Sequence, residues 1–141
     1  MTLRVELVVP EGQIRSGRAN MVIAKTLDGD IGVLTGHTPV LGILAEGSLV
    51  RIMPEGAADA AVGAEVVAAV NGGFFSVADD RVSILAREAQ LGEEVDARAA
   101  RSALDEAVQR AEASPGGEGE PADVRYYRAL LRAAGDPADR A

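Results

Sequence analysis

The stretch Asn71–Ala86, NGGFFSVADDRVSILA, carries the clearest fold signal in this chain of 141 residues. Two runs of apolar and β-branched residues, Phe74–Val77 and Val82–Leu85, flank the pair Asp79-Asp80. Aspartate tolerates the positive φ angles of a two-residue hairpin turn, so the spacing predicts an antiparallel hairpin with solvated carboxylates at its tip. We therefore do not expect this carboxylate pair to perform acid–base catalysis.

Short strand-like segments continue the same pattern back to the N-terminus. Residues Leu3–Leu7 alternate apolar and charged side chains with a period of two, which is typical of a strand with one buried face. Short strands separated by a turn about every 8 to 12 residues predict an antiparallel β-sandwich or barrel. The other predicted segments are Met21–Ala24, Ile31–Leu34, Val40–Leu44, Ser48–Met53 and Glu65–Val70, and the predicted turns include Pro10–Gly12, Asp28-Gly29, Pro54–Gly56 and Asn71–Gly73.

A helical pattern replaces the strand pattern near Gln90. The segment Glu93–Ala113 contains no glycine and has apolar residues at i, i+3 and i+4 spacing, which predicts an amphipathic helix. A Gly/Pro-rich stretch at 114–121 then predicts a loop, and a second helix is predicted at Ala122–Ala134, with Gly135 as its stop and Pro137 beyond it. The predicted stripes are Ala97, Ala100, Leu104, Val108 and Ala111 in the first helix, and Val124, Tyr127, Leu131 and Ala134 in the second.

These patterns predict a mainly β sandwich over residues 1–88 followed by an antiparallel α-helical hairpin over residues 89–141. The first helical stripe consists largely of alanine, and burial of one methyl-sized group contributes only about 0.8 kcal/mol. The hairpin is therefore expected to dock weakly and to be detachable, as a two-state switch requires. The alternative is that alanine permits close helix packing and that the hairpin stays docked.

Composition excludes several function classes. The formal net charge is −8, with 22 acidic against 14 basic residues, which argues against a nucleic-acid partner. The chain has no cysteine, so thiolate chemistry and disulfides are excluded. No apolar run approaches the ~18 residues of a membrane span, and the first residues lack a signal-peptide pattern. We expect membrane association only through a partner.

The single histidine, His37, lies in the glycine-rich stretch GDIGVLTGHTPVLGIL, residues 29–44. Its glycine spacing matches neither the dinucleotide fingerprint nor the P-loop, and one histidine without cysteine does not suffice for a usual zinc site. His37 is expected to be a loop or interface residue. A hydrolase in which His37 meets Ser48 or Ser76 through the fold remains an alternative.

Three stretches together, residues 3–12, 29–44 and 71–86, resemble the epsilon subunit of the F-type ATP synthase, the counterpart of the mitochondrial delta subunit. The matching features are Gly-Asp-Ile-Gly-x-Leu-x-Gly-His-x-Pro and, later, Gly-Gly-Phe followed by strand, turn and strand. The resemblance implies a sandwich of about ten strands with a C-terminal helical hairpin. It also implies a noncatalytic rotor subunit without a cofactor, peripheral on the cytoplasmic face of the cell membrane.

The resemblance also implies partners and contact residues. The sandwich would bind the gamma subunit and the c-ring, with Asp30, Gly36, His37 and Thr38 at the ring-facing end. The hairpin would extend into the catalytic head, where basic residues meet an acidic segment of the beta subunit and ATP hydrolysis is inhibited. The candidates for this contact are Arg98, Arg101, Arg125 and Arg128.

Some members of the family bind ATP through a Leu/Ile-Asp-x-x-Arg-Ala motif at the start of the first helix. This chain has Val95-Asp-Ala-Arg-Ala-Ala100, in which the arginine comes one residue early. One position turns a side chain by ~100° around a helix, so Asp96 and Arg98 depart from the family's nucleotide ligands. An autonomous small-molecule-binding or nucleotide-binding sandwich remains the alternative function.

Overall fold

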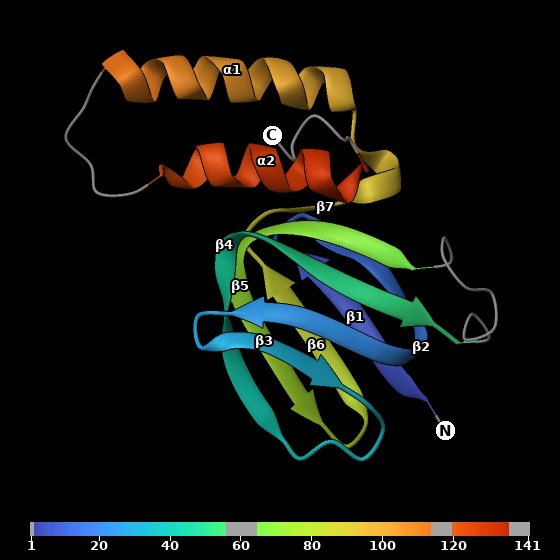
Figure 1. Cartoon of the computed structure of the whole chain (residues 1–141). Coiled ribbons are helices and arrows are strands. Elements are labelled where there is room, and N and C mark those ends of the chain that lie inside the picture. Colours follow the sequence, from blue (N-terminus) through green and yellow to red (C-terminus); the bar gives the residue numbers. More distant parts are fainter. Residues whose placement is uncertain (1, 56–64, 114–119, 136–141) are drawn as a thin grey trace.

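The computed structural model describes residues 2–55, 65–113 and 120–135, and in these ranges the chain forms a seven-stranded sheet and two α-helices (Figure 1). A 3-10 turn at Gly92–Glu94 connects the strands to α1 (Ala97–Ala113), and α2 (Ala122–Ala133) follows. The predicted β-sandwich with a C-terminal helical hairpin is confirmed. The strands are β1 (Leu3–Val9), β2 (Gly12–Thr26), β3 (Gly29–Val33), β4 (Val40–Pro54), β5 (Val66–Ala78), β6 (Arg81–Ala86) and β7 (Ala89–Leu91).

The sheet closes on itself because its long strands pair with different neighbours along their length. The strand order is β1-β6-β5-β4-β2-β3, while β2 also pairs with β1 and β7 pairs with β5. All pairings are antiparallel, as predicted, except that of β1 with β6. Parallel neighbours need a long crossover connection, and the intervening strands β2 to β5 supply it.

The described residues form seven strands where the resemblance implied about ten, because predicted segments merge. β4 joins two predicted segments across Gly47, and β5 joins two across Asn71–Gly73. Gly47, Gly72 and Gly73 have φ angles of +66°, +79° and +135°, so they bend the strands without ending them. The turn predicted at Asn71–Gly73 was therefore wrong.

The Asp79-Asp80 hairpin turn is confirmed. The two aspartates have φ angles of +51° and +59°, and Ala78 pairs with Arg81 across the turn. Positive φ at both central residues matches the right-handed twist of the flanking strands. One layer of side chains from the strands enters the sandwich core, whose largest fully buried members are Phe75, Leu3, Leu7, Leu44 and Ile84, whereas Leu131 of α2 belongs to a second cluster between the helices and the sheet.

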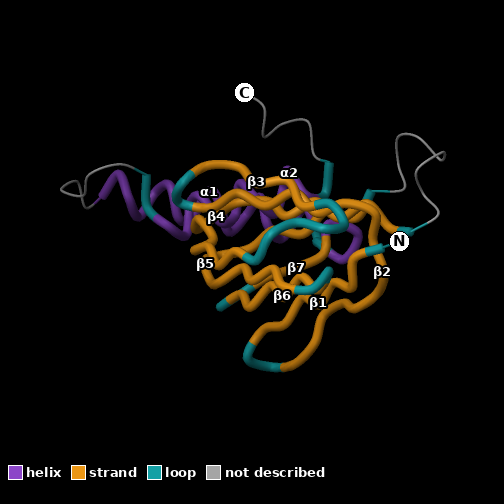
Figure 2. Tube along the Cα trace, turned by 90° about the horizontal axis from the view of Figure 1, so that it is seen from below, coloured by secondary structure: helices purple, strands orange, loops and turns teal. Residues whose placement is uncertain are grey.

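Helix α2 lies between the sheet and α1 (Figure 1). It packs on β4 and β5 on one side and on α1 on the other. In the view from below, both helices lie behind the strands (Figure 2). Because α2 has neighbours on two sides, the narrow stripe predicted for it was incomplete: the buried residues are Val124, Tyr126, Ala129, Leu130 and Leu131.

The alanine-rich stripe of α1 packs on α2 and not on the sandwich. In α1 only Ala100 and Ala107 are buried. The weak alanine interface was expected between the hairpin and the sandwich, but it lies between α1 and α2. Helix α2 contacts the sheet through larger side chains. The predicted loop at 114–121 lies outside the described residues except for Glu120 and Pro121, as do Gly56 and Pro137.

β7 continues the strand region to Leu91, three residues beyond the predicted domain boundary at residue 88. It pairs with Ala68–Val70 of β5 and brings the chain to the 3-10 turn beside the C-terminal end of α2. In the described part of the chain, neither helix combines the length and apolarity that crossing a membrane requires.

Candidate functional site

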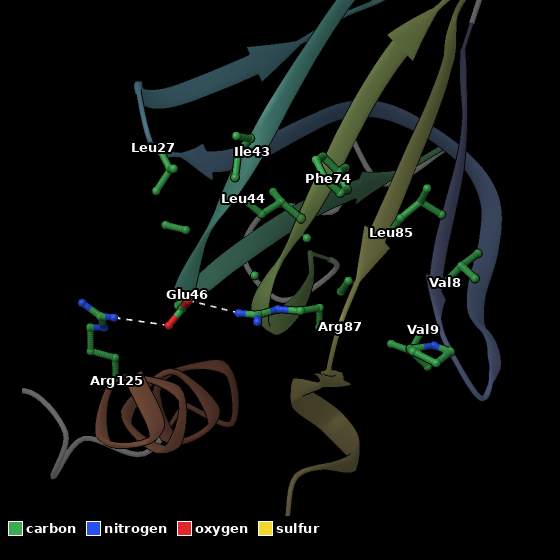
Figure 3. Close-up of a pocket in the computed structure, with 15 residues that line it drawn as sticks. Val8, Val9, Leu27, Ile43, Leu44, Glu46, Phe74, Leu85, Arg87 and Arg125 are labelled. Carbon is green, nitrogen blue, oxygen red and sulfur yellow. Dashed lines mark hydrogen bonds and ion pairs between the residues drawn. The ribbon is translucent and has the colours of Figure 1, made fainter. Parts of the chain in front are cut away.

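A row of apolar side chains crosses the outer surface of the sandwich from β1 to the β2–β3 turn. Neighbours in the row pair across strands: Ile43 with Phe74, Phe74 with Leu85, and Leu85 with Val8. Leu27 continues the row, and its N–H donates to the Ile43 carbonyl at 2.9 Å. We refer to Val8, Leu27, Ile43, Phe74 and Leu85 as the apolar row (Figure 3).

Most of the apolar row is open to solvent. The exposed fraction is 67% for Leu27, 52% for Ile43, 53% for Phe74 and 49% for Leu85. Single exposed apolar residues are ordinary on a soluble protein, but a contiguous set of this kind marks a protein–protein or ligand contact. The outer face of these strands is therefore the candidate functional site.

This surface was not predicted from the sequence, although the strand sequences carry a signal for it. A strand with one solvated face needs a polar residue at each outward position. Four strands instead reach the row with an apolar doublet, as in Phe74-Phe75, where Phe75 is fully buried and Phe74 is exposed. The doublets are Leu7-Val8, Ile43-Leu44, Phe74-Phe75 and Ile84-Leu85, and in each the buried member is Leu7, Leu44, Phe75 or Ile84.

The apolar row borders an open hollow of about 690 Å³, which Pro10, Gly72 and Gly73 also line. A Cβ on Gly73 would collide with the backbone of Leu85, so glycine is required where β5 and β6 approach each other. The volume falls in the range of small-molecule sites, but such sites usually enclose their ligand. The exposed lining fits a protein surface better.

One end of the hollow is polar (Figure 3). Glu46 of β4 forms ion pairs with Arg87, which follows β6, and with Arg125 of α2. The N···O distances are 3.1 Å and 3.4 Å and involve different carboxylate oxygens. The three residues thus connect the sandwich to the helical hairpin. We refer to Glu46, Arg87 and Arg125 as the arginine fork.

The predicted residues Gly36, His37 and Thr38 lie together in the loop between β3 and β4, at the end of the sandwich away from the helices (Figure 1). The Gly36 N–H donates to an Asp80 carboxylate oxygen at 2.6 Å, which ties this loop to the β5–β6 turn. The His37 Nδ1 atom lies 2.7 Å from the Thr38 carbonyl oxygen. In the described part of the chain, no hydrogen bond joins His37 to a serine.

The structure does not place Asp30 beside His37. Asp30 pairs with Lys25 near the start of β3, whereas His37 follows the end of that strand. Asp30 lines a smaller hollow, of about 240 Å³, together with Gly47 and Arg132. β3 is nevertheless the terminal strand in the sheet order, so one partner lying along this edge would reach both residues.

The four predicted hairpin arginines divide between the two helices. Arg98 and Arg101 are exposed on α1, the outer layer, and Arg101 has an interaction of its own. On α2, Arg125 pairs with Glu46 and Arg128 pairs with Glu120 at 2.7 Å. Neither acidic partner lies within α2 itself.

Asp96 has a local structural role. Its carboxylate accepts the backbone N–H of Ala99 at 3.1 Å, and its carbonyl accepts the N–H of Ala100 at 2.9 Å. This is the geometry of a helix N-cap, which satisfies donors that the first turn of α1 leaves unpaired. Capping is sufficient to explain Asp96 at this position without a nucleotide.

The interface between α2 and the sandwich contains one unusual polar group, the Tyr126 hydroxyl. It is buried and has no hydrogen-bond partner among the described residues. Burial raises the pKa of the Tyr126 phenol well above its ordinary range, and the nearby Glu88 carboxylate raises it further. Within the described ranges, no three histidine, aspartate or glutamate side chains are grouped to hold a metal ion.

Comparison with protein families gives a match over the strand region. Residues 2–92 match the family described as "ATP synthase, Delta/Epsilon chain, beta-sandwich domain". The ATP synthase epsilon chain of Thermobifida fusca is 53% identical over 110 residues, which are 77% of this chain and 77% of the relative. The epsilon chain of Streptomyces griseus is 42% identical over 130 residues, which are 92% of this chain and 97% of the relative.

Solved structures show the same architecture. A chain in the Euglena gracilis mitochondrial ATP synthase OSCP/F1/c-ring structure matches with a TM-score of 0.68 and 25% identity, covering 95% of this chain and 79% of that one. A chain in the Tetrahymena thermophila mitochondrial ATP synthase central stalk/c-ring structure has a TM-score of 0.52 and 18% identity. It covers 68% of this chain and 71% of that one, and supports the fold alone.

Proposed function

This chain belongs to the ATP synthase delta/epsilon family, and from that premise we propose that it is a noncatalytic central-stalk subunit of a proton-translocating F-type ATP synthase. The sandwich binds the gamma subunit and the c-ring and transmits rotation between them. The subunit reaches the cytoplasmic face of the cell membrane as a peripheral component of the complex.

The observation that carries this proposal is the apolar row. Its exposed leucine, isoleucine and phenylalanine side chains adjoin one another across the strands, and no part of the described chain covers them. Binding energy at protein interfaces concentrates in such central apolar anchors. We assign this surface to the gamma subunit, because a subunit that rotates with gamma must be firmly bound to it.

The ring contact runs along the β3 edge. Gly36, His37 and Thr38 occupy the end of the sandwich away from the helices, in the loop that follows β3, and Asp30 lies on this edge strand itself. Polar loops of a c-ring find backbone and side-chain partners there. His37 thus serves as a contact residue and has no catalytic role.

The hairpin inhibits ATP hydrolysis by leaving the sandwich and entering the catalytic head. The support is that the arginines of α1 and α2 are exposed and can meet an acidic partner, whereas leaving the sandwich requires α2 to expose the larger side chains that it buries against the sheet. Arg98, Arg101, Arg125 and Arg128 then face the acidic segment of the beta subunit. Ending the chain after Leu91 should raise ATP hydrolysis by the assembled enzyme, and unchanged hydrolysis would count against inhibition.

Binding to the α3β3γ complex of the same organism, purified without this subunit, tests the gamma assignment. A variant carrying both Ile43→Ser and Phe74→Ser should bind at least about tenfold more weakly, because it loses two apolar anchors. Leu34→Ser is the matched control, because the Leu34 side chain is similarly exposed, at 57%, but lies outside the apolar row. Equal affinities of the double variant and the wild type would overturn the assignment.

A further inference from the structure

The arginine fork has more positive charge than its own carboxylate neutralises. Two guanidinium groups share the single carboxylate of Glu46, which leaves a net charge of +1 at this end of the hollow. The side chains of Arg87 and Arg125 are 66% and 46% exposed, respectively. Each guanidinium carries five N–H donors, and the bond to Glu46 uses one of them in each arginine. Donors therefore remain available to a further acceptor.

We propose that the arginine fork binds an aspartate or glutamate side chain of the gamma segment that covers the apolar row. This inference rests on the proposed function and adds the chemistry of the partner segment to it. A carboxylate matches the planar fork of donors on arginine and complements the net positive charge. The partner segment is therefore amphipathic, with apolar residues over the row and an acid at one end.

The geometry of β4 sets the spacing in that segment. Ile43 of the row and Glu46 of the fork are three positions apart in one strand, or about 10 Å at ~3.3 Å per residue. A helical partner covers this length in about seven residues at ~1.5 Å each, and an extended partner covers it in about three. The acid thus lies two helical turns from the apolar anchor, or three residues from it in an extended segment.

The fork also couples gamma binding to the position of the hairpin. Arg87 and Glu46 belong to the sandwich, whereas Arg125 belongs to α2. The complete fork exists only while α2 is docked, so an acid bound to both arginines stabilises the docked hairpin. Because coupling between two equilibria is reciprocal, docking of α2 strengthens gamma binding by the same factor.

The test is a titration of full-length variants against the same epsilon-free α3β3γ complex at low and high salt. Arg87→Gln and Arg125→Gln should each weaken binding about tenfold at low salt and less at high salt, because screening reduces charge–charge attraction. Arg51→Gln is the control: Arg51, like Arg125, is 46% exposed and pairs with a glutamate, Glu65 at 3.3 Å, but it does not line this hollow. It should bind like the wild type.

Glu46→Gln separates a direct contact from an indirect effect through α2. This variant loses both ion pairs but keeps both arginines for the partner. If the arginines bind an acid of gamma, Glu46→Gln binds as tightly as the wild type or more tightly. If their variants act only by loosening α2, Glu46→Gln weakens binding as they do, and the inference is overturned.

The variants of the apolar row keep the two proposals distinguishable. Loss of binding in the Ile43→Ser and Phe74→Ser double variant, with no effect of Arg87→Gln and Arg125→Gln, would overturn the fork and leave the gamma surface intact. Wild-type affinity of the double variant would overturn the gamma surface itself. Weakened binding in both sets, with Glu46→Gln unimpaired, is the result expected for an acid in the fork.

Discussion

Gly47 of β4 lies directly against the backbone of Arg125 in α2. A Cβ atom on Gly47 would come within 2.5 Å of the Arg125 carbonyl carbon, a contact that folded proteins do not tolerate. Gly92 faces the carbonyl of Ala133, near the other end of α2, in the same way. The helix thus docks where two chain positions have no side chain, which makes these glycines determinants of the docked hairpin.

Gly47→Ala should shift the hairpin away from the sandwich. The substitution puts a methyl group against the α2 backbone and forces alanine to a φ of +66°, which alone costs about 1 kcal/mol or more. We expect trypsin to cleave at the arginines of α2 at least about fivefold faster. Gly17→Ala is the control, because nothing lies within 4 Å of a Cβ at that position. Equal cleavage rates in both variants would show that Gly47 does not set docking.

Phe74 and Phe75 should differ in their effect on stability although they are adjacent. Phe75 is fully buried, so Phe75→Ala should lower the free energy of unfolding by about 3–5 kcal/mol through lost contacts and a cavity. Phe74→Ala, at an exposed position, should lower it by less than about 1 kcal/mol. Urea unfolding followed by circular dichroism measures both. Similar losses would mean that the row belongs to the core.

Tyr126 should make stability fall in alkaline solution. Burial raises the pKa of its phenol above the unfolded value of about 10, so the folded state favours the neutral form. Its contribution is fully present below pH 10 and is lost as the pH rises toward the folded pKa. The unfolding free energy of the wild type should therefore drop above pH 10, and that of Tyr126→Phe should drop less.

At neutral pH, Tyr126→Phe should leave stability unchanged or raise it by up to about 1 kcal/mol, because the buried hydroxyl has no partner. Tyr127→Phe is the matched control, since Tyr127 is only half-buried. A loss of more than about 1 kcal/mol in Tyr126→Phe would reveal a hydrogen bond to that hydroxyl.

Asp80 should hold the His37 loop in place through its bond to the Gly36 N–H. Asp80→Ala removes this bond and leaves alanine at a φ of +59°, so the unfolding free energy should fall by about 1–3 kcal/mol. Asp79→Gly removes the strain of a side chain at a positive φ and keeps the bond between Asp80 and the Gly36 N–H, so the free energy of unfolding should stay the same or rise. Amide hydrogen exchange at Gly36 should quicken only in Asp80→Ala, and unchanged exchange there would refute the link.

The hairpin turn at Asp79-Asp80 was predictable because two residues with a tolerance for positive φ lay between matched strands. The cluster Asn71–Gly73 was not, because glycine permits a turn and a bulge equally well. The pairing of β4 with β5 decided the question, since both strands bend at adjacent positions: Glu46 pairs with Asn71, next to Gly47. Such a choice depends on a neighbour that is distant in sequence.

Less of the candidate site than of the fold could be predicted from the sequence. The apolar doublets show that a strand has two apolar faces, but only the strand order aligns Ile43, Phe74 and Leu85 in one row. The arginine fork combines residues 46, 87 and 125, whose separation along the chain leaves no spacing pattern. Tyr126 was likewise not predicted to be buried, because one helical stripe cannot describe a helix covered on two sides.

Site-directed photocross-linking tests the central claim, that the apolar row is seated on gamma, most directly. The chain has no cysteine, so Ile43→Cys provides a unique site for benzophenone maleimide, and Ser16→Cys provides an exposed site outside the hollow. In the assembled ATP synthase of the same organism, we expect the label at position 43 to cross-link mainly to gamma, and more than the label at position 16. Cross-links from position 43 only to other subunits, or none at all, would contradict the account.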